Sequence, residues 1–380
     1  MGLDKQVIQM VKMINFIKLV RLLVISLSLF LLAGNSYGYD IKPGTKVLLR
    51  MLVLEGYAPE EDRLIFQKMM LNKYRVKVEF KIDYVIGPEQ FLESLRRRSH
   101  ELLTPSHNIP KSLRWPLIKS RLLLPIQTEN IPNFKKIIPS LQQTDFLTEN
   151  GNVYAVPFLQ GSYGLVYDSS LTEEPKSWKA LWEPAAIGKY AVSSGYPEVN
   201  VYITALATGV DKSDVSNLDI VDTPAFRRNL ASLANNAARV WHGVDTAEIL
   251  SGLAYSTSWG FALADLNADG RPWKMADPIE GSPAWVNTWA LAAHLKNSPD
   301  QLWVAEKWIN FVISDVTQLS YMRRLGASPT NANVAKIATA SETRDFHIGD
   351  TKHFDDLWFW PILSSKTQFA YDNMWREVFQ

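Results

Sequence analysis

Hydrophobic and polar positions follow two different periods in the first third of the chain. Apolar residues run together at 46–55, as in a buried strand, and apolar and polar residues alternate at 76–84, as in a strand with one covered face. Helical stretches at 59–73 and 88–98 follow these strands, and the first opens with a proline and acidic residues that suit the positive end of a helix dipole. A short strand is expected at 101–104. This order predicts a parallel sheet with helices on its faces.

The rest of the chain continues the pattern and adds long apolar stretches. Residues 153–167 are apolar and contain glycines, and we expect a strand that crosses from one domain to another. A helix is expected at 224–238, and a strand at 286–293 that returns to the first domain. In such sheets ligands bind beyond the carboxyl ends of the strands, which points to the loops at 54–57 and 106–108.

The N-terminal segment has the parts of a secretory signal. An apolar run at 22–33 follows basic residues and precedes the small residues Ser36 and Gly38. The run is shorter than the ~20 residues that span a bilayer, so we expect export to the periplasm and cleavage near Gly38. A retained membrane anchor is the alternative. Translation from Met13 instead of Met1 would give a signal of more usual length.

Composition narrows the classes of function. The chain has 380 residues, of which 47% are apolar, enough for two domains with a substantial core. Lysine and arginine total 40 and aspartate and glutamate 39, a balance that gives no support to a nucleic-acid binder. The chain has no cysteine, so neither disulfides nor a lipid-modified cysteine are expected. We see no nucleophile–base set and no metal cluster, and we expect neither an enzyme nor a cofactor.

One stretch begins like a calcium loop, with Asp265, Asn267, Asp269 and Gly270 in the expected order. Its twelfth position is Ala276, where calcium needs a bidentate glutamate. We therefore expect a hairpin turn around Asp269 and Gly270 and no metal site.

Four segments, taken in order, resemble a known family. They are VPFLQGSYGLVYD, SWKALWEP, PIEGSPAWVNTWAL and GASPTNANV. Their order is similar to that of the type II periplasmic solute-binding proteins, and most similar to the spermidine/putrescine-binding branch. The resemblance covers Val47 to about Glu377.

The resemblance implies an α/β fold of two lobes, each a mixed, mostly parallel sheet flanked by helices. A ligand cleft lies between the lobes, which close about a hinge. On this basis we expect a first lobe of residues 39–158 with 285–330 and a second lobe of 159–284 with 331–380, after a signal at 1–38. The implied function is capture of a small organic ligand and its delivery to an ABC permease. A polyamine-like amine is the first ligand that we expect. The alternative partner is a membrane sensor protein that reads the bound ligand.

The resemblance also assigns residues to the cleft. Trp259 and Trp285 fall on two pocket tryptophans of the family, with the family's spacing between them. Tyr57 falls on an aromatic contact and Ser106 on a serine of the pocket. Each has an alternative role in packing alone, because tryptophans usually lie in the core and a serine commonly caps a turn.

Charge is the open question of this expected pocket. Asn287 falls on the family's aspartate that pairs with a ligand amine, and Asn108 falls on an expected aromatic residue. Glu198 or Asn200 stands for an acidic position, depending on where a gap is placed. An ammonium on an indole face gains ~0.5–2 kcal/mol, but its burial without a carboxylate costs several kcal/mol. The chain therefore either supplies the anion from Glu55 or Glu198, or binds a less cationic ligand.

Overall fold

The structure is a computed structural model, and it describes residues 41–379. The expected signal at 1–38 and its cleavage near Gly38 lie outside the described residues. No helix among the described residues is long and apolar enough to cross a membrane.

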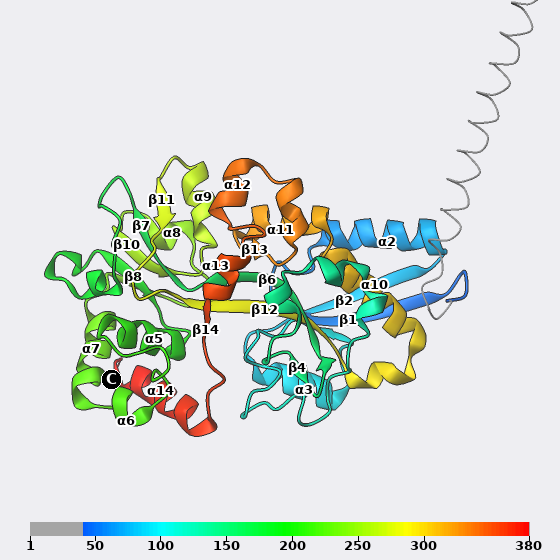
Figure 1. Cartoon of the computed structure of the whole chain (residues 1–380), viewed down its shortest axis with the longest axis horizontal. Coiled ribbons are helices and arrows are strands. Elements are labelled where there is room, and N and C mark those ends of the chain that lie inside the picture. The colour runs from blue at the N-terminus through cyan, green and yellow to red at the C-terminus, as the bar shows by residue number, and fades with distance from the viewer. Residues whose placement is uncertain (1–40, 380) are drawn as a thin grey trace, which may run out of the picture. The chain divides into compact units, whose positions relative to one another are not determined.

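Seven strands form the first sheet, in the order β13-β6-β12-β3-β1-β2 with β14 beside β12 (Figure 1). Strand β1 pairs in parallel with β2 and β3, whereas β12 is antiparallel to β3 and β6. The strands are β1 (Lys46–Val53), β2 (Lys77–Tyr84), β3 (Leu102–Leu103), β6 (Ala155–Ser162), β12 (Pro283–Leu291), β13 (Ser328–Pro329) and β14 (Trp358–Phe359).

Five strands form the second sheet, in the order β11-β7-β10-β8-β9. Strands β10, β8 and β9 are parallel, and β7 is antiparallel to β10 and β11. The strands are β7 (Gly164–Asp168), β8 (Tyr190–Ser193), β9 (Arg239–Trp241), β10 (Tyr255–Ser258) and β11 (Trp273–Met275). A separate two-stranded ribbon contains β4 (Thr148–Glu149) and β5 (Asn152–Val153).

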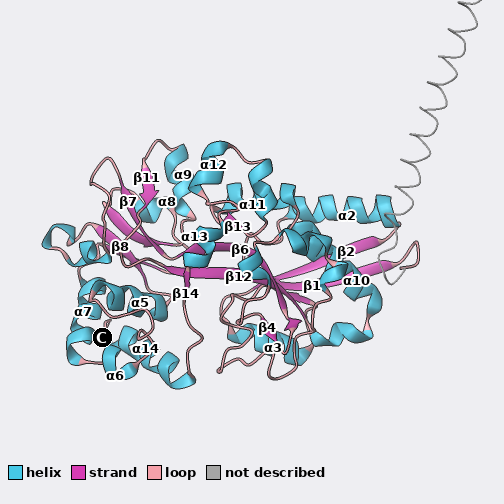
Figure 2. Cartoon of the chain, in the orientation of Figure 1, coloured by secondary structure: helices cyan, strands magenta, loops and turns pink. Residues whose placement is uncertain are grey.

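Helices surround both sheets (Figure 2). The α-helices are α2 (Glu60–Tyr74), α3 (Glu89–Arg97), α4 (Pro139–Gln142), α5 (Pro197–Ala207), α6 (Leu218–Val221), α7 (Pro224–Asn235), α8 (Ala247–Leu250), α9 (Ala262–Ala268), α10 (Pro299–Val312), α11 (Asp315–Leu325), α12 (Ala340–Asp345), α13 (Thr351–Asp356) and α14 (Ser365–Glu377). The 3₁₀ helices are η1 (Thr128–Asn130), η2 (Pro132–Lys136), η3 (Trp178–Trp182), η4 (Pro184–Ala186), η5 (Ala293–Asn297) and η6 (Ala332–Lys336).

The first sheet is covered because α2 and α10 bury aromatic side chains between them. Phe66 on α2 lies 5.2 Å from Trp308 and 5.6 Å from Phe311, both on α10, measured between ring centroids. Helix α2 begins after Pro59, carries acidic residues in its first turn and ends at Arg75 with a positive φ of 59°. Pro59 and the acidic residues are the start signals that the sequence contains, and the expected helix is confirmed.

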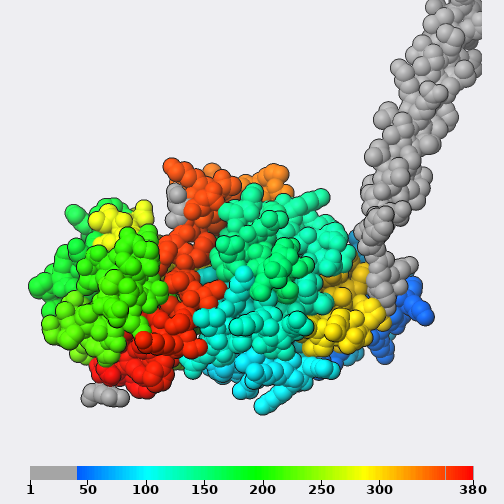
Figure 3. All heavy atoms as spheres, turned by 60° about the horizontal axis from the view of Figure 1, so that its bottom comes forward, coloured from blue at the N-terminus to red at the C-terminus, as the bar shows by residue number. Residues whose placement is uncertain are grey.

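Three stretches of chain connect the two sheets. Strand β6 belongs to the first sheet and β7 to the second, and only Tyr163 separates them, within the stretch expected to cross. Strand β12 brings the chain back into the first sheet. After β14 the chain leaves the first sheet again, and α14 contacts α5 and α7 beside the second sheet. In Figure 3 this C-terminal segment, in red, runs between green and cyan parts of the surface. The expected lobe boundaries stay a prediction.

The expected hairpin at Asp269 and Gly270 is wrong. Residues Ala262–Ala268 form α9, Asp269 ends it, and Gly270 takes a positive φ of 75°. The helix forms because Ala262 and Leu266 are four residues apart and both are buried on the same face. The following strand β11 pairs with β7 rather than with a neighbour across this turn.

Candidate ligand-binding site

Asn287, on a central strand of the first sheet, joins the segments that follow the carboxyl ends of β1 and β3. It lies on β12 and is 7% exposed. Its Nδ2 donates to the Tyr57 hydroxyl at 2.6 Å, and its Oδ1 accepts from the Ser106 hydroxyl at 2.7 Å. Tyr57 follows the carboxyl end of β1 and Ser106 follows that of β3, so the loops expected from the sheet rule meet here. The register of β12 against β6 shifts between Asn287 and Thr288, a local irregularity of the kind that re-aims side chains.

Tyr57 is fixed by its own turn. Its backbone N–H donates to the Leu54 carbonyl at 3.1 Å, and its carbonyl accepts from the Tyr321 hydroxyl at 2.7 Å. The turn needs Gly56, because φ there is 83° and a Cβ would lie 3.0 Å from the Leu325 side chain. Burial raises the pKa of Tyr57 above its usual range, so its hydroxyl stays protonated.

Trp285 lies two residues before Asn287 on β12, and its ring contacts that of Trp259. The two indole centroids are 6.5 Å apart at an interplanar angle of 75°. Trp285 is 3% exposed and Trp259 is half-buried. The Trp285 ring fits because Gly161 faces it on β6, where a Cβ would come within 2.7 Å of the indole. The two expected tryptophans are therefore together, one from each sheet.

Further aromatic rings surround Trp259 that sequence reasoning missed. Tyr163 and Tyr196 lie 4.7 and 4.8 Å from it, and Trp360 lies 6.1 Å away, between ring centroids. Phe261 lies 6.5 Å from Trp285. Tyr196 follows the carboxyl end of β8, as Trp259 follows that of β10. Because ligands bind beyond the carboxyl ends of parallel strands, the position of Tyr196 could have been found from the sequence.

Asp245 holds the Trp259 loop in place. Its carboxylate accepts hydrogen bonds from the Trp259 N–H at 2.9 Å, the Ser258 hydroxyl at 2.6 Å and the Ala262 N–H at 3.2 Å. Burial raises the pKa of Asp245, and these hydrogen bonds oppose that rise. Asp245 lies 13 residues from Ser258 along the chain, and its role had no sequence signal.

Glu198 faces α14 rather than the indole pair. It lies in the first turn of α5 and is half-buried, two residues after Tyr196. Burial, and less strongly the charge of Asp372, raise the pKa of Glu198 to about 7 against hydrogen bonds that include one with Gln368. Both Gln368 and Asp372 belong to α14.

The remaining expected residues differ in their surroundings. The Asn200 side chain is engaged in a hydrogen bond within the protein, in which its Nδ2 donates to the Ser193 carbonyl at 2.7 Å. Glu55 is exposed in the turn that contains Tyr57. Asn108 is half-buried, and its Oδ1 has no hydrogen-bond partner among the described residues. We call the hydrogen-bonded set of Tyr57, Asn287 and Ser106 the Asn287 brace. Among the described residues, neither Glu55 nor Asn108, two of the eight expected site residues, is hydrogen-bonded to it.

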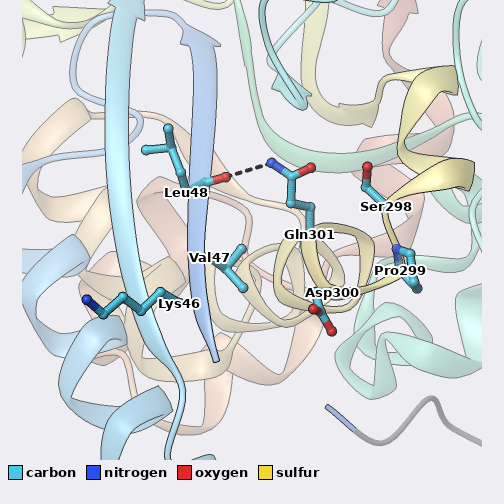
Figure 4. Close-up of a pocket in the computed structure, with 7 residues that line it drawn as sticks. All are labelled: Lys46, Val47, Leu48, Ser298, Pro299, Asp300 and Gln301. Atoms are coloured by element: carbon cyan, nitrogen blue, oxygen red, sulfur yellow. Dashed lines mark hydrogen bonds between the residues drawn. The ribbon is translucent and has the colours of Figure 1, made fainter. Parts of the chain in front are cut away.

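A hollow of about 270 Å³ lies away from these residues (Figure 4). Its walls are Lys46 to Leu48, at the amino end of β1, and Ser298 to Gln301, at the start of α10. The Gln301 Nε2 donates to the Leu48 carbonyl at 2.9 Å across it. Because Tyr57 follows the opposite end of β1, this hollow does not belong to the site.

Comparison with known proteins identifies the family. The family model described as "Bacterial extracellular solute-binding protein" matches residues 109–347. The chain is 22% identical over 250 residues to spermidine/putrescine-binding periplasmic protein 1 of Haemophilus influenzae, a match that covers 65% of each chain. The chain thus spans about two thirds of that relative's length.

Solved structures share the fold. A putative spermidine/putrescine ABC transporter from Listeria monocytogenes superimposes with a TM-score of 0.72 at 16% identity, over 88% of this chain and 99% of that one. The spermidine/putrescine substrate-binding protein PotD from Streptococcus pneumoniae gives 0.71 at 15% identity, over 87% and 98%. The expected two-lobed α/β fold and the resemblance to this branch are confirmed. The chain belongs to the bacterial extracellular solute-binding proteins.

Proposed function

We propose that this protein is exported, captures a small organic amine between its two sheets and delivers it to an ABC permease. The observation that carries the proposal is the contact between Trp259 and Trp285, two residues along β12 from the Asn287 brace. The names of the relatives, which are spermidine/putrescine-binding proteins, support an amine as ligand.

Each part of the site has a physical role in this proposal. Indole faces cover the methylene chain of the ligand and attract its ammonium group by ~0.5–2 kcal/mol. Asn287 uses one N–H on Tyr57 and one lone pair for Ser106, which leaves a donor and an acceptor for the ligand. Glu198 faces α14 two residues after Tyr196, so it would act on a bound ammonium only at longer range, where the positive charge would lower its pKa.

Closure of the two lobes follows from contacts that join them. Gly326, after α11, and Gly260, after β10, approach so closely that a Cβ on Gly326 would lie 3.1 Å from the Gly260 carbonyl oxygen. A ligand that touches Trp285 on one side and Trp259 on the other would stabilise a closed arrangement of the lobes over an open one.

Calorimetry with putrescine, spermidine and norspermidine tests the ligand class. The protein must be folded and free of ligand beforehand. Heat of binding from at least one of the three supports the proposal. No heat from any of them removes the polyamine-like ligand and favours a less cationic one, as the neutral Asn287 suggests. Delivery to a permease is tested separately, by stimulation of ATP hydrolysis in the reconstituted transporter whose genes neighbour this one.

We propose binding without catalysis. The one acid–histidine–serine arrangement of note in the described residues joins Asp83, His100 and Ser94, with His100 Nε2 2.8 Å from Asp83 and Nδ1 2.7 Å from the Ser94 oxygen. Ser94 is 4% exposed on α3, and Ser99 also contacts the same ring nitrogen at 3.0 Å. A serine so enclosed serves the packing of the first sheet rather than a reaction.

A further inference from the structure

Positive charge gathers at the amino ends of β1 and β2. Seven lysine and arginine side chains lie on the segments that meet there, six of them exposed and the last one half-buried. We call this set the basic pole, and its members are Lys42, Lys46, Lys73, Arg75, Lys77, Lys296 and Lys307. In the whole chain 40 basic and 39 acidic residues nearly balance, so the pole is a local excess of positive charge.

Backbone contacts bring the first part of the pole together. Lys46 and Lys77 are paired where β1 and β2 begin. The Lys77 N–H donates to the Thr45 carbonyl at 2.9 Å, and the Gly44 N–H donates to the Arg75 carbonyl at 2.8 Å. The loops that lead into the two strands therefore present their basic side chains next to each other.

Two aromatic rings join the start of α10 to the end of α2. The rings of Tyr74 and Trp303 have centroids 4.9 Å apart at 87°. The Lys73 Nζ lies 5.1 Å from the centroid of Tyr74, and the Lys307 Nζ lies 5.3 Å from that of Trp303. Lys296 is exposed on η5, just before α10. In Figure 3 the blue segment that contains β1 and the yellow segment around η5 share one end of the described part.

Few acidic groups oppose this charge. No member of the pole forms an ion pair with another described residue. Glu79 on β2 and Asp300 on α10 are the nearest acids along these segments outside the core, and Lys46 extends away from Asp300 (Figure 4). Glu306 is buried and accepts a hydrogen bond from Asn130. The pole therefore keeps most of its positive charge.

Helix capping does not account for the pole. Lys73 is in the last turn of α2, where the helix dipole favours a positive charge. Lys42, Lys46 and Lys77 lie on a loop and on strands, where no helix dipole acts. Leu48, two residues after Lys46 on β1, is 44% exposed, so the same end also presents an apolar side chain.

We propose that the basic pole holds the exported protein on a membrane surface of anionic phospholipids. Clusters of about four to eight lysine and arginine side chains are attracted to negative headgroups in this way. Tryptophan and tyrosine rings favour the headgroup level of a membrane, which is consistent with Tyr74 and Trp303 at the same end. The inference rests on the proposed export and not on the ligand class of the cleft.

The chain that precedes the described residues joins the fold at this pole. Ile41 directly precedes Lys42, and the apolar run expected to enter the membrane ends at Ala33. The connecting residues 34–41 span at most about 30 Å when extended. While the expected signal is in the membrane, the pole is therefore within reach of the headgroups.

Membrane contact at the pole leaves the cleft residues free. Tyr57 follows the carboxyl end of β1, whereas the pole lies at its amino end. The strand has eight residues, which span about 26 Å. A protein held by the pole can therefore bind its ligand while it stays near the membrane that contains the permease.

Co-sedimentation with vesicles tests the inference. The protein is purified from the periplasm, and mass spectrometry determines its N-terminus. Vesicles of phosphatidylglycerol provide the anionic surface, and vesicles of phosphatidylcholine provide the neutral one. We expect binding to the anionic vesicles at about 0.05 M NaCl, little binding to the neutral ones, and release at about 0.5 M because salt screens the charges.

A triple variant of the pole, Lys42→Gln, Lys46→Gln and Lys77→Gln, should weaken binding to anionic vesicles at least about tenfold. The reason is that each cation near such a surface contributes about fivefold. The matched control removes three exposed lysines beside the second sheet and should bind like the unaltered protein. Its changes are Lys179→Gln, Lys189→Gln and Lys366→Gln.

The control loses the same net charge as the pole variant, so the comparison isolates the position of the charge. Any part of residues 1–40 that remains is the same in every protein. Equal binding to both kinds of vesicle, no binding to the anionic vesicles at low salt, or equal weakening in the two triple variants would overturn the inference. Circular dichroism shows that both variants fold, as expected for changes at exposed side chains.

Discussion

In the proposed site, the neutral amide of Asn287 should limit the positive charge that a ligand can carry, because it lies between Tyr57 and Ser106. Both ends of the amide are hydrogen-bonded to hydroxyl groups, of Tyr57 and Ser106. A hydroxyl donates to a carboxylate as readily as it accepts from an amide N–H. The brace is therefore compatible with an aspartate at the same position, which makes Asn287→Asp a test of ligand charge with little change in shape.

Asn287→Asp should raise affinity for a diamine about tenfold relative to a monoamine of equal length, since a charge-assisted hydrogen bond is worth ~1.5–3 kcal/mol. Calorimetry with putrescine and butylamine measures the ratio. In the ligand-free variant the new carboxylate is partly desolvated, so the free energy of unfolding should fall. An unchanged diamine-to-monoamine ratio would mean that ligand charge is bound elsewhere, with Glu198 as the first candidate.

Trp285→Leu should weaken amine binding about tenfold, because the substitution removes the indole face from the cleft. The matched control is Trp289→Leu, four residues along the same strand, where the indole is also buried and packs against Phe158 and Trp308. Both variants should lose less stability than the ~3–5 kcal/mol of a Trp→Ala change. Calorimetry and urea unfolding on both proteins separate the roles. Equal affinities in the two variants would assign Trp285 to packing alone.

At the scale of single elements, hydrophobic periodicity predicted the positions of several helices and strands. Features that depend on tertiary contacts could not be predicted in this way. Strands β1 and β2 and helices α2 and α3 lie where period and capping signals indicated, because each buries a regular face. The role of Asp245 was not predicted, because its hydrogen-bond partners Ser258 and Trp259 are distant in sequence and become neighbours only in the folded protein. The hairpin at Gly270 was wrong because the glycine ends a helix, and a turn signal does not reveal the preceding element.

If the protein binds an amine as proposed, we expect Glu198, in the first turn of α5, to make the affinity depend on pH. Its folded pKa of about 7 lies above the ordinary value of 4.5. The contribution of Glu198 to the free energy of unfolding is therefore largest below pH 4.5, where the carboxyl group is protonated in both the folded and the unfolded state. This contribution is lost as the pH rises through about 7. Amine binding has the opposite sign, since the ligand attracts the ionised form. We expect affinity to rise between about pH 6 and 8, and calorimetry across that range measures it.

Glu198→Gln is the control for this pH dependence. The amide has nearly the same shape and no charge, so the affinity of this variant should be lower and flat between about pH 6 and 8. Its stability should no longer fall over the window in which Glu198 ionises. A slope equal to that of the unaltered protein would assign the titration to another group.

At the scale of the whole described part, one exposed ion pair links the two sheets. Arg114 belongs to the segment whose neighbours Ile109 and Leu117 pack with Leu103 of β3, and Asp372 lies on α14 beside α5 and α7. The Arg114 guanidinium is 3.3 Å from the Asp372 carboxylate, and the two side chains are 49% and 27% exposed. Such a pair adds little to folding, at most ~1 kcal/mol, and we predict that it breaks when the lobes open.

Arg114→Gln should therefore lower ligand affinity about two- to fivefold while leaving the urea unfolding midpoint nearly unchanged. The matched control is Arg344→Gln, whose ion pair with the adjacent Asp345 is local and persists in any arrangement of the lobes. A double-mutant cycle with Asp372→Asn isolates the pair, because the coupling should appear in the binding free energy and be absent from the free energy of unfolding. If coupling appeared only in unfolding, the pair would belong to the folded core in both states. Closure would then depend on the ligand contacts of Trp259 and Trp285 alone.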